Sequence, residues 1–167
     1  YERHLGENWS QHMANPELWA KIDKIPDAEL WQRHCILKER LIAYTRDRVR
    51  WSRQDRGEAA DEVAAVDRLL DPNTLTLGFA RRFSPYKRGY LIFRDLQRSV
   101  RILSNAKRPI QLIFAGKAHP ADDEGKRIIQ RLMEWCRHPA LRDRVAFIEN
   151  YDMYTSKLLV RGVDVWL

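Results

Sequence analysis

Residues 74–88 read TLTLGFARRFSPYKR, and this stretch passes from an apolar segment directly into a cluster of cations. Leu75, Leu77 and Phe79 alternate with polar or small residues, which is the pattern of a short strand. The turn-forming residues Asp-Pro-Asn stand immediately before it. The stretch therefore predicts a strand that ends at a positively charged turn.

The turn itself has the features of a helix start. Ser84 precedes a proline, the order typical of an N-cap residue followed by the first helical position. Arg81, Arg82 and Lys87 surround this point, although unpaired N–H groups and the helix dipole already make a helix N-terminus positive. A bound phosphate or carboxylate would relieve the repulsion, so the turn is a candidate anion site. Solvated surface charge on a basic protein is the alternative interpretation.

From residue 74 onward, strand patterns alternate with helix patterns. The predicted strands are Thr74–Ala80, Ile110–Ala115, Val145–Ile148 and Val163–Leu167. The predicted helices between them are Pro85–Ser104, Asp122–Arg137 and Met153–Val160. Strands joined by helices of this length form right-handed crossovers, so the fold class is α/β, a Rossmann-like parallel sheet with helices on both faces.

Helices also precede the sheet. Asp27 is the candidate N-cap of a long helix whose apolar face includes Leu41 and Tyr44, with Arg48 in the same register. A second helix is predicted from about Glu58 to Leu70. We therefore expect a leading helical segment, 1–73, that packs on a Rossmann-like layer, 74–167.

In a parallel sheet, every strand ends at the same edge, where ligands of such folds bind. Arg81 and Arg82 follow the first predicted strand, Gly116-Lys117 the second, and Glu149-Asn150-Tyr151 the third. This convergence favours a phosphate-handling site over scattered surface charge. No dinucleotide fingerprint or P-loop is present. The carboxylates of Asp122 and Asp123 are interpreted as helix-capping groups, whereas the role of His119 stays open.

Composition narrows the class of protein. The 30 basic residues are spread along the chain among 23 acidic ones and leave a net charge of +7. This distribution makes a nucleic-acid-binding module a minor alternative. Cys35 and Cys136 are expected to be buried thiols, and His34 a packed histidine, so no metal site is expected. No membrane-spanning run or signal peptide is recognisable, and the default expectation is a cytoplasmic protein.

Four strings then resemble the C-terminal half of the α-glucan (glycogen or maltodextrin) phosphorylases, in particular their bacterial and archaeal branch. They are GFARRFSPYKR (78–88), LIFAGKAHP (112–120), VAFIENYDM (145–153) and GVDVWL (162–167), in this order and spacing. The resemblance implies part of a GT-B glycosyltransferase that binds pyridoxal 5′-phosphate. It also implies reversible phosphorolysis of terminal α-1,4-linked glucose to α-D-glucose 1-phosphate.

The resemblance further implies roles for individual residues. Arg82 corresponds to the arginine that binds the substrate phosphate, and Tyr86 to a tyrosine that contacts the glucosyl unit. Lys87, Arg81 and Tyr151 match positions that hold the cofactor, although Arg81 stands where many members have lysine. Arg82 and Lys87 are accordingly the expected catalytic residues.

The lysine that forms the Schiff base with the cofactor is expected outside this chain, so we expect a fragment that is inactive by itself. The implied partners are α-1,4-glucan, inorganic phosphate and glucose 1-phosphate, with no nucleic acid and no membrane; a homo-oligomeric state is left open. The alternative enzyme is a retaining nucleotide-sugar glycosyltransferase of GT-B architecture, because such enzymes also place an arginine and a lysine next to the diphosphate of their donor.

Overall fold

The computed structural model describes residues 1–167, which divide into two compact units, 1–36 and 37–167. The division groups the helical residues 37–70 with the sheet. The sequence-based organisation into 1–73 and 74–167 remains a prediction about the domains.

The smaller unit consists of short helical turns beside an aromatic cluster. Its elements are α1 (Glu2–Leu5), a 3-10 turn (Trp9–Gln11), α2 (Pro16–Trp19), a second 3-10 turn (Ala20–Lys24) and the beginning of α3 (Asp27–Asp55). The ring centroids of Tyr1, Trp9 and Trp19 lie 5.1 to 6.4 Å apart. Nε2 of His4 lies 3.0 Å from Oε1 of Glu29, which ties α1 to the first turn of α3.

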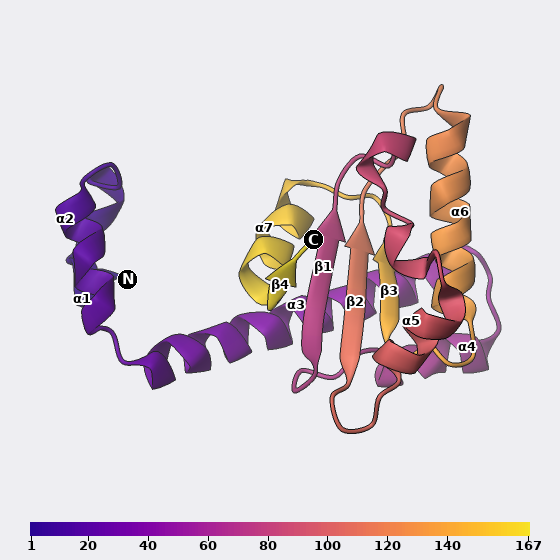
Figure 1. Cartoon of the computed structure of the whole chain (residues 1–167), viewed down its shortest axis with the longest axis horizontal. Coiled ribbons are helices and arrows are strands. Elements are labelled where there is room, and N and C mark those ends of the chain that lie inside the picture. The colour runs from indigo at the N-terminus through magenta and orange to yellow at the C-terminus, as the bar shows by residue number, and fades with distance from the viewer. The chain divides into compact units, whose positions relative to one another are not determined.

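The larger unit is built on a four-stranded parallel sheet with the order β3-β2-β1-β4 (Figure 1). Its strands are β1 (Leu75–Ala80), β2 (Ile110–Ala115), β3 (Val145–Ile148) and β4 (Val165–Trp166). The accompanying helices are α4 (Ala60–Ala64), α5 (Leu96–Leu103), α6 (Asp123–Arg137) and α7 (Met153–Gly162). The predicted fold class, a parallel α/β sheet with flanking helices, is confirmed.

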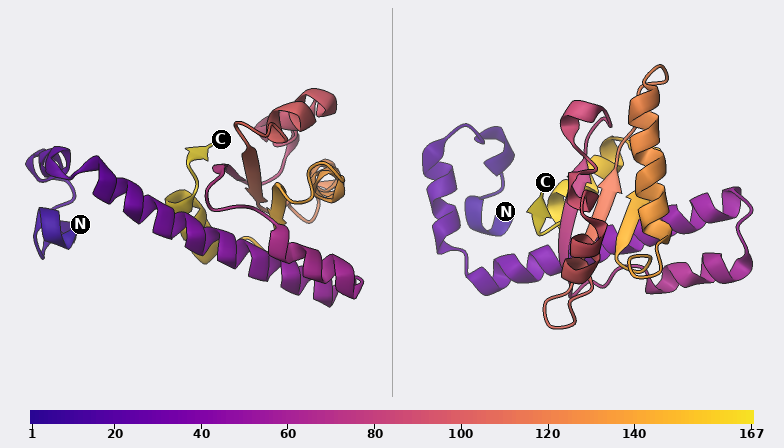
Figure 2. Two further views of the ribbon diagram at one scale, coloured as in Figure 1. Left: turned by 90° about the horizontal axis from the view of Figure 1, so that it is seen from below. Right: turned by 45° about the vertical axis from the view of Figure 1, so that its right-hand side comes forward.

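Both faces of the sheet are covered (Figure 2). Leu112 and Phe114 of β2 belong to a hydrophobic cluster with residues of α5 and α6, whereas Ile113 and Ala115 belong to a second cluster with residues of α3 and α7. Successive side chains of a strand point to opposite faces, so a strand buried on both faces reads as an uninterrupted apolar run. This is why β2 shows no alternation of apolar and polar residues.

On one face of the sheet, α7 approaches α3 closely at Gly162. A Cβ atom added at Gly162 would lie 2.8 Å from Cβ of Leu41 and 2.9 Å from the carbonyl oxygen of Leu37. Any side chain here would therefore push α7 away from α3. The glycine at this position lets the two helices pack against the same face of the sheet.

One buried ion pair connects α3 to β1 and to the start of the edge strand β4. Nζ of Lys38 lies 2.7 Å from Oδ2 of Asp164, and the two side chains are only 4% and 10% exposed. The same carboxylate oxygen accepts a hydrogen bond of 2.7 Å from the backbone N–H of Thr76 in β1. Asp164 directly precedes β4, so this pair fixes the helix, β1 and the start of β4 together.

A second charged network joins the end of α3 to α6. Glu58 accepts hydrogen bonds of 3.0 Å from Nε of Arg56 and 2.9 Å from Nη2 of Arg137. Burial acts to raise the pKa of Glu58, but these bonds outweigh it and hold the pKa below its ordinary value of 4.5. The carboxylate therefore stays charged when it is folded into this network.

Several sequence-based predictions of helix boundaries are wrong. The predicted helix Pro85–Ser104 is interrupted: residues Pro85–Lys87 and Leu91–Phe93 form 3-10 turns, and α5 begins only at Leu96. Two features explain the break. Arg88 has a left-handed backbone with φ of 52°, and the side chain of Asp95 caps α5 by accepting a bond from the N–H of Arg98.

The remaining differences are smaller. α3 already includes Asp27 as its first residue, so Asp27 is not the N-cap, and the main-chain carbonyl of Pro26 accepts bonds from Glu29 and Leu30. The predicted helix 58–70 is shortened to α4 and a 3-10 turn, Ala65–Arg68. The strands Ile110–Ala115 and Val145–Ile148 are confirmed residue for residue.

The buried ion pair generates a stability prediction. Asp164→Ala should destabilise the fold by about 3 kcal/mol, because it leaves Lys38 buried without its carboxylate and the N–H of Thr76 without its acceptor. Thermal or denaturant unfolding measures the effect. Asp47→Ala is the matched control, since its partner pair with Arg50 is exposed and should contribute less than about 1 kcal/mol. Equal effects of the two variants would contradict this account.

The Glu58 network generates a pH prediction. A carboxyl group whose pKa is depressed by folding adds stability above its unfolded value near 4.5 and loses it as the pH falls. Glu58→Gln should therefore cost roughly 1–2 kcal/mol at pH 7, and the cost should shrink below about pH 4.5. Unfolding measured at pH 3 and pH 7 tests this. Glu62→Gln is the control, because that side chain is 52% exposed and its carboxylate comes no closer to Arg53 than 3.6 Å. A cost for Glu58→Gln that is independent of pH would sink the idea.

Candidate functional site

The first three strands end level with one another. Ala80, the last residue of β1, is paired with Ala115 of β2, and Ala115 is paired with Ile148 of β3. Neighbouring strands lie about 4.8 Å apart. The chain therefore leaves the sheet at three adjacent points along one edge, which we call the carboxyl edge (residues 81–88, 116–119 and 149–152).

The loops after β1 and β2 are held against each other. The backbone N–H of Phe83 donates a 2.9 Å hydrogen bond to the carbonyl of Lys117. Gly116 has a φ of 154°, and a Cβ atom there would lie only 2.1 Å from the carbonyl oxygen of Arg81. Only a glycine allows this approach, so Gly116 fixes where Arg81 and Lys117 leave the sheet.

The cations of this edge face solvent. Arg81, Arg82 and Lys117 are exposed and Lys87 is half-buried, and none of these four lies within ion-pair distance of a carboxylate. Nζ of Lys87 instead lies 4.6 Å from the ring centroid of Tyr86, which is itself 73% exposed. Guanidinium and ammonium groups without carboxylate partners are free to donate hydrogen bonds to the oxygens of a phosphate.

The third loop, after β3, brings Tyr151 to the same edge. Tyr151 is half-buried and packs on the cluster between the sheet and α3. Asp152 follows it and caps α7 by accepting a 2.8 Å bond from the N–H of Thr155. That bond is the main reason why the pKa of Asp152 lies below its ordinary value, and the charges of Arg48 and Lys117 add to the effect. Lys117 therefore faces an acidic neighbour from the adjacent loop.

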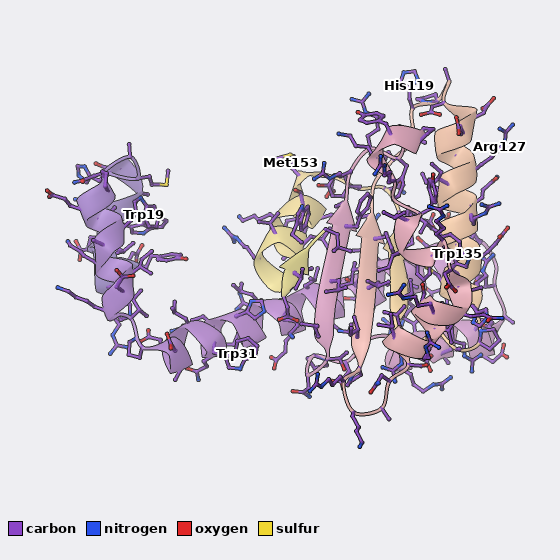
Figure 3. The ribbon with its side chains drawn as sticks, in the orientation of Figure 1. Trp19, Trp31, His119, Arg127, Trp135 and Met153 are labelled. Atoms are coloured by element: carbon purple, nitrogen blue, oxygen red, sulfur yellow. The ribbon has the colours of Figure 1, made fainter.

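The loop residues that the sequence left in doubt have local roles. Nδ1 of His119 accepts a 3.1 Å bond from the N–H of Ala121 within its own loop. Asp122 accepts a 2.8 Å bond from the N–H of Gly125, which confirms that it caps α6. Figure 3 labels His119 on the β2–α6 loop and Met153 at the start of α7, both on the side where the strands end. No group of three or more potential metal ligands is present.

The two cysteines differ. Cys136 is buried between α6 and the sheet, and burial raises the pKa of its thiol to about 12, although Arg53 and Arg137 oppose the effect. This thiol stays protonated at neutral pH and is not a nucleophile. Cys35 is only half-buried, so the prediction that both cysteines are buried is wrong for Cys35. The reason is its place on α3, where the neighbouring residues of the helix are partly exposed.

Sequence reasoning missed two contributors to this edge. Nη2 of Arg48 in α3 donates a 3.0 Å bond to the carbonyl oxygen of Glu149, the first residue after β3. The hydroxyl of Ser84 is buried without a partner, and it does not cap the turn that follows. The single signal for Arg48 in the sequence is its position in the apolar register of the helix, and nothing in the sequence pointed to the buried state of Ser84.

No helix of the structure combines the length and the apolar character that crossing a bilayer requires.

The comparisons with known proteins concern the whole chain. No family model matches it.

Several curated proteins are similar to it. The glycogen phosphorylase of Aquifex aeolicus is 48% identical over 168 residues, which is 100% of this chain and 24% of that protein. The glycogen phosphorylase of Mycobacterium tuberculosis is 42% identical over 95% of this chain, and the maltodextrin phosphorylase of Thermococcus litoralis is 37% identical over 99% of it. The chain spans about a quarter or less of these relatives, 24%, 18% and 19% of their lengths respectively. Over its whole length the chain is thus similar to one part of the longer α-glucan phosphorylases of bacteria and archaea.

Proposed function

We propose that this chain forms part of the phosphate-binding half of an α-glucan phosphorylase. The observation that carries the proposal is the level ending of three parallel strands at an edge where Arg81, Arg82 and Lys87 have no carboxylate partner. Its relatives are named for glycogen and maltodextrin. Those names give no support to a nucleotide-sugar transferase or to a nucleic-acid-binding module.

The proposed reaction moves one glucosyl unit from a glucan to inorganic phosphate. The bond between C1 of the terminal glucose and the 4-oxygen of the next glucose breaks, and C1 forms a bond to a phosphate oxygen. The proton that this phosphate carried ends on the released 4-hydroxyl. The products are α-D-glucose 1-phosphate and a glucan shorter by one unit.

The donor set of the carboxyl edge fits the phosphate group of pyridoxal 5′-phosphate, the proposed cofactor, because exposed guanidinium and ammonium groups bind phosphate oxygens well. When bound, this cofactor supplies a phosphate that can donate and accept a proton beside the substrate phosphate. Two phosphates a few ångströms apart repel strongly unless cations lie between or around them. A cluster of cations with no carboxylate partner meets this requirement.

Within the cluster, we assign different partners to different residues. Arg82 binds the substrate phosphate and Tyr86 contacts the glucosyl unit. Arg81, Lys87 and Tyr151 hold the cofactor. The exposed ring of Tyr86 and the Lys87 ammonium leave the same 3-10 turn, so the proposed glucosyl and cofactor contacts lie side by side.

The assignment of Arg82 predicts a selective defect. Arg82→Ala in the full-length protein should raise the KM for phosphate about 10- to 100-fold, because it removes charge-assisted hydrogen bonds to the substrate. Cofactor content, measured by absorbance after gel filtration, should stay close to that of the unmodified protein. Arg101→Ala, an exposed arginine in the last turn of α5, is the matched control. Parallel loss of phosphate affinity and cofactor would show that the two roles have been divided wrongly.

A second prediction concerns the 167-residue chain alone. It should release no glucose 1-phosphate from maltodextrin, because its relatives are about four times longer or more and the proposed site needs groups from outside these residues. An enzyme-coupled assay for glucose 1-phosphate measures this, with the full-length protein as the positive control. Turnover by the isolated chain would overturn the proposed division of the site.

A further inference from the structure

The segment after β3 is held from one side by α3. Tyr44 and Arg48 lie one helical turn apart and so share a face of α3. The hydroxyl of Tyr44 lies 2.7 Å from Oγ1 of Thr155, and Nη2 of Arg48 donates a 3.0 Å bond to the carbonyl of Glu149. These two bonds anchor the two ends of residues 149–155, which we call the β3–α7 segment.

The first anchor is reinforced by a second arginine. Nη1 of Arg56, directly after α3, bonds the carboxylate of Glu149. Arg56 is itself fixed by its 3.0 Å bond to Glu58. Both polar ends of Glu149, its main-chain carbonyl and its carboxylate, are therefore held by arginines from or next to one helix.

The backbone turns sharply between the anchors. Asn150 adopts a left-handed conformation with φ of 56°, which asparagine tolerates better than most residues that carry a side chain. Tyr151 follows at once, and the Asp152 cap then starts α7. The direction in which Tyr151 leaves the strand thus depends on how Glu149 and Thr155 are held.

The contacts of Arg48 are poorly suited to stabilising the folded state. Arg48 forms no ion pair: its single hydrogen bond goes to a neutral carbonyl, its Nε is buried without a partner, its guanidinium carbon lies 5.5 Å from the centroid of the Trp51 ring, and its charge acts on Asp152 only from beyond ion-pair distance. The desolvation of a guanidinium offsets much of what one such bond contributes. By contrast, Arg53 and Arg56 of the same region pair with carboxylates. The placement of Arg48 is better explained by the conformation it imposes on the neighbouring loop.

We propose that Arg48 is a positioning residue, which acts through the main-chain carbonyl of Glu149 to hold Tyr151 at the carboxyl edge for contact with the cofactor. The inference rests on the proposed function, because it takes Tyr151 as a cofactor-binding residue. It adds a residue from α3, a helix that makes no contribution to the family motifs quoted above. Arg56 and Tyr44 support the same segment at its two ends.

A double-mutant cycle in the full-length protein tests this. The four forms are the unmodified protein, Arg48→Met, Tyr151→Ala and the double variant, each freed of cofactor and titrated with pyridoxal 5′-phosphate. Arg48→Met keeps the length of the side chain but removes the donor, and should weaken the apparent affinity about tenfold. In the Tyr151→Ala background it should have no further effect, because the residue through which it acts is gone.

Two further variants separate positioning from general stability. Arg48→Lys retains a cation and a donor and should recover part of the affinity lost in Arg48→Met. Arg50→Met is the matched control, since Arg50 lies on the same helix but pairs with exposed Asp47 and Asp67. Thermal unfolding of the cofactor-free forms should show similar midpoints for Arg48→Met and Arg50→Met, with a loss of cofactor affinity only in Arg48→Met.

Each alternative outcome is distinct. Equal loss of affinity in both backgrounds, or a lowered unfolding midpoint with unchanged affinity, overturns the positioning role of Arg48. An unchanged affinity in Tyr151→Ala overturns it as well, while the proposed function stands as long as the unmodified protein binds the cofactor. Failure of the unmodified full-length protein to bind pyridoxal 5′-phosphate removes the proposed function itself.

Discussion

The level pairing of β1, β2 and β3 is the constraint on which the candidate site depends. Because Ala80, Ala115 and Ile148 are in register, three loops of very different sequence start side by side. A shift of one residue in any pairing would turn that strand over, exchanging its two buried faces and redirecting the loop that follows. The apolar cores on both faces of the sheet therefore fix the geometry of the polar edge, and Phe83 and Tyr151 of that edge pack against them.

Charge is distributed in two ways in the larger unit. Near the end of α3, Arg53, Arg56 and Arg137 gather around Glu58, so their charge serves the packing of helices. At the carboxyl edge, Arg81, Arg82, Lys87 and Lys117 form no ion pair with a carboxylate. The net charge of the protein does not distinguish these two uses of arginine, whereas the partner of each side chain does.

The sheet was predictable because its signals are local and strong. The apolar runs of β2 and β3 are bounded by turn residues, and parallel topology follows from the helices between strands. The interruption of the predicted helix at Arg88 escaped the pattern. In the folded chain, Gly89 lies where a Cβ atom would come within 2.8 to 3.1 Å of the rings of Phe79 and Phe83, which are brought together only by folding. The motifs in the sequence pointed to Arg81, Arg82, Lys87 and Tyr151 as site residues. The sequence gave no indication that Arg48 bonds to Glu149, which lies 101 positions away along the chain.

The strand order also has a consequence for how the chain folds. Contacts between the starts of β1 and β2 join residues 35 positions apart, as in Thr76 and Gln111, whereas Thr76 and Asp164 beside β4 are 88 positions apart. Closing the longer loop costs roughly 0.8 kcal/mol more in chain entropy, a modest difference that the buried contacts of Lys38 can offset once they form. We therefore expect β4 to dock last, because its anchor needs α3, β1 and Asp164 together. The three strands that carry the carboxyl edge can assemble by short crossovers before β4 arrives.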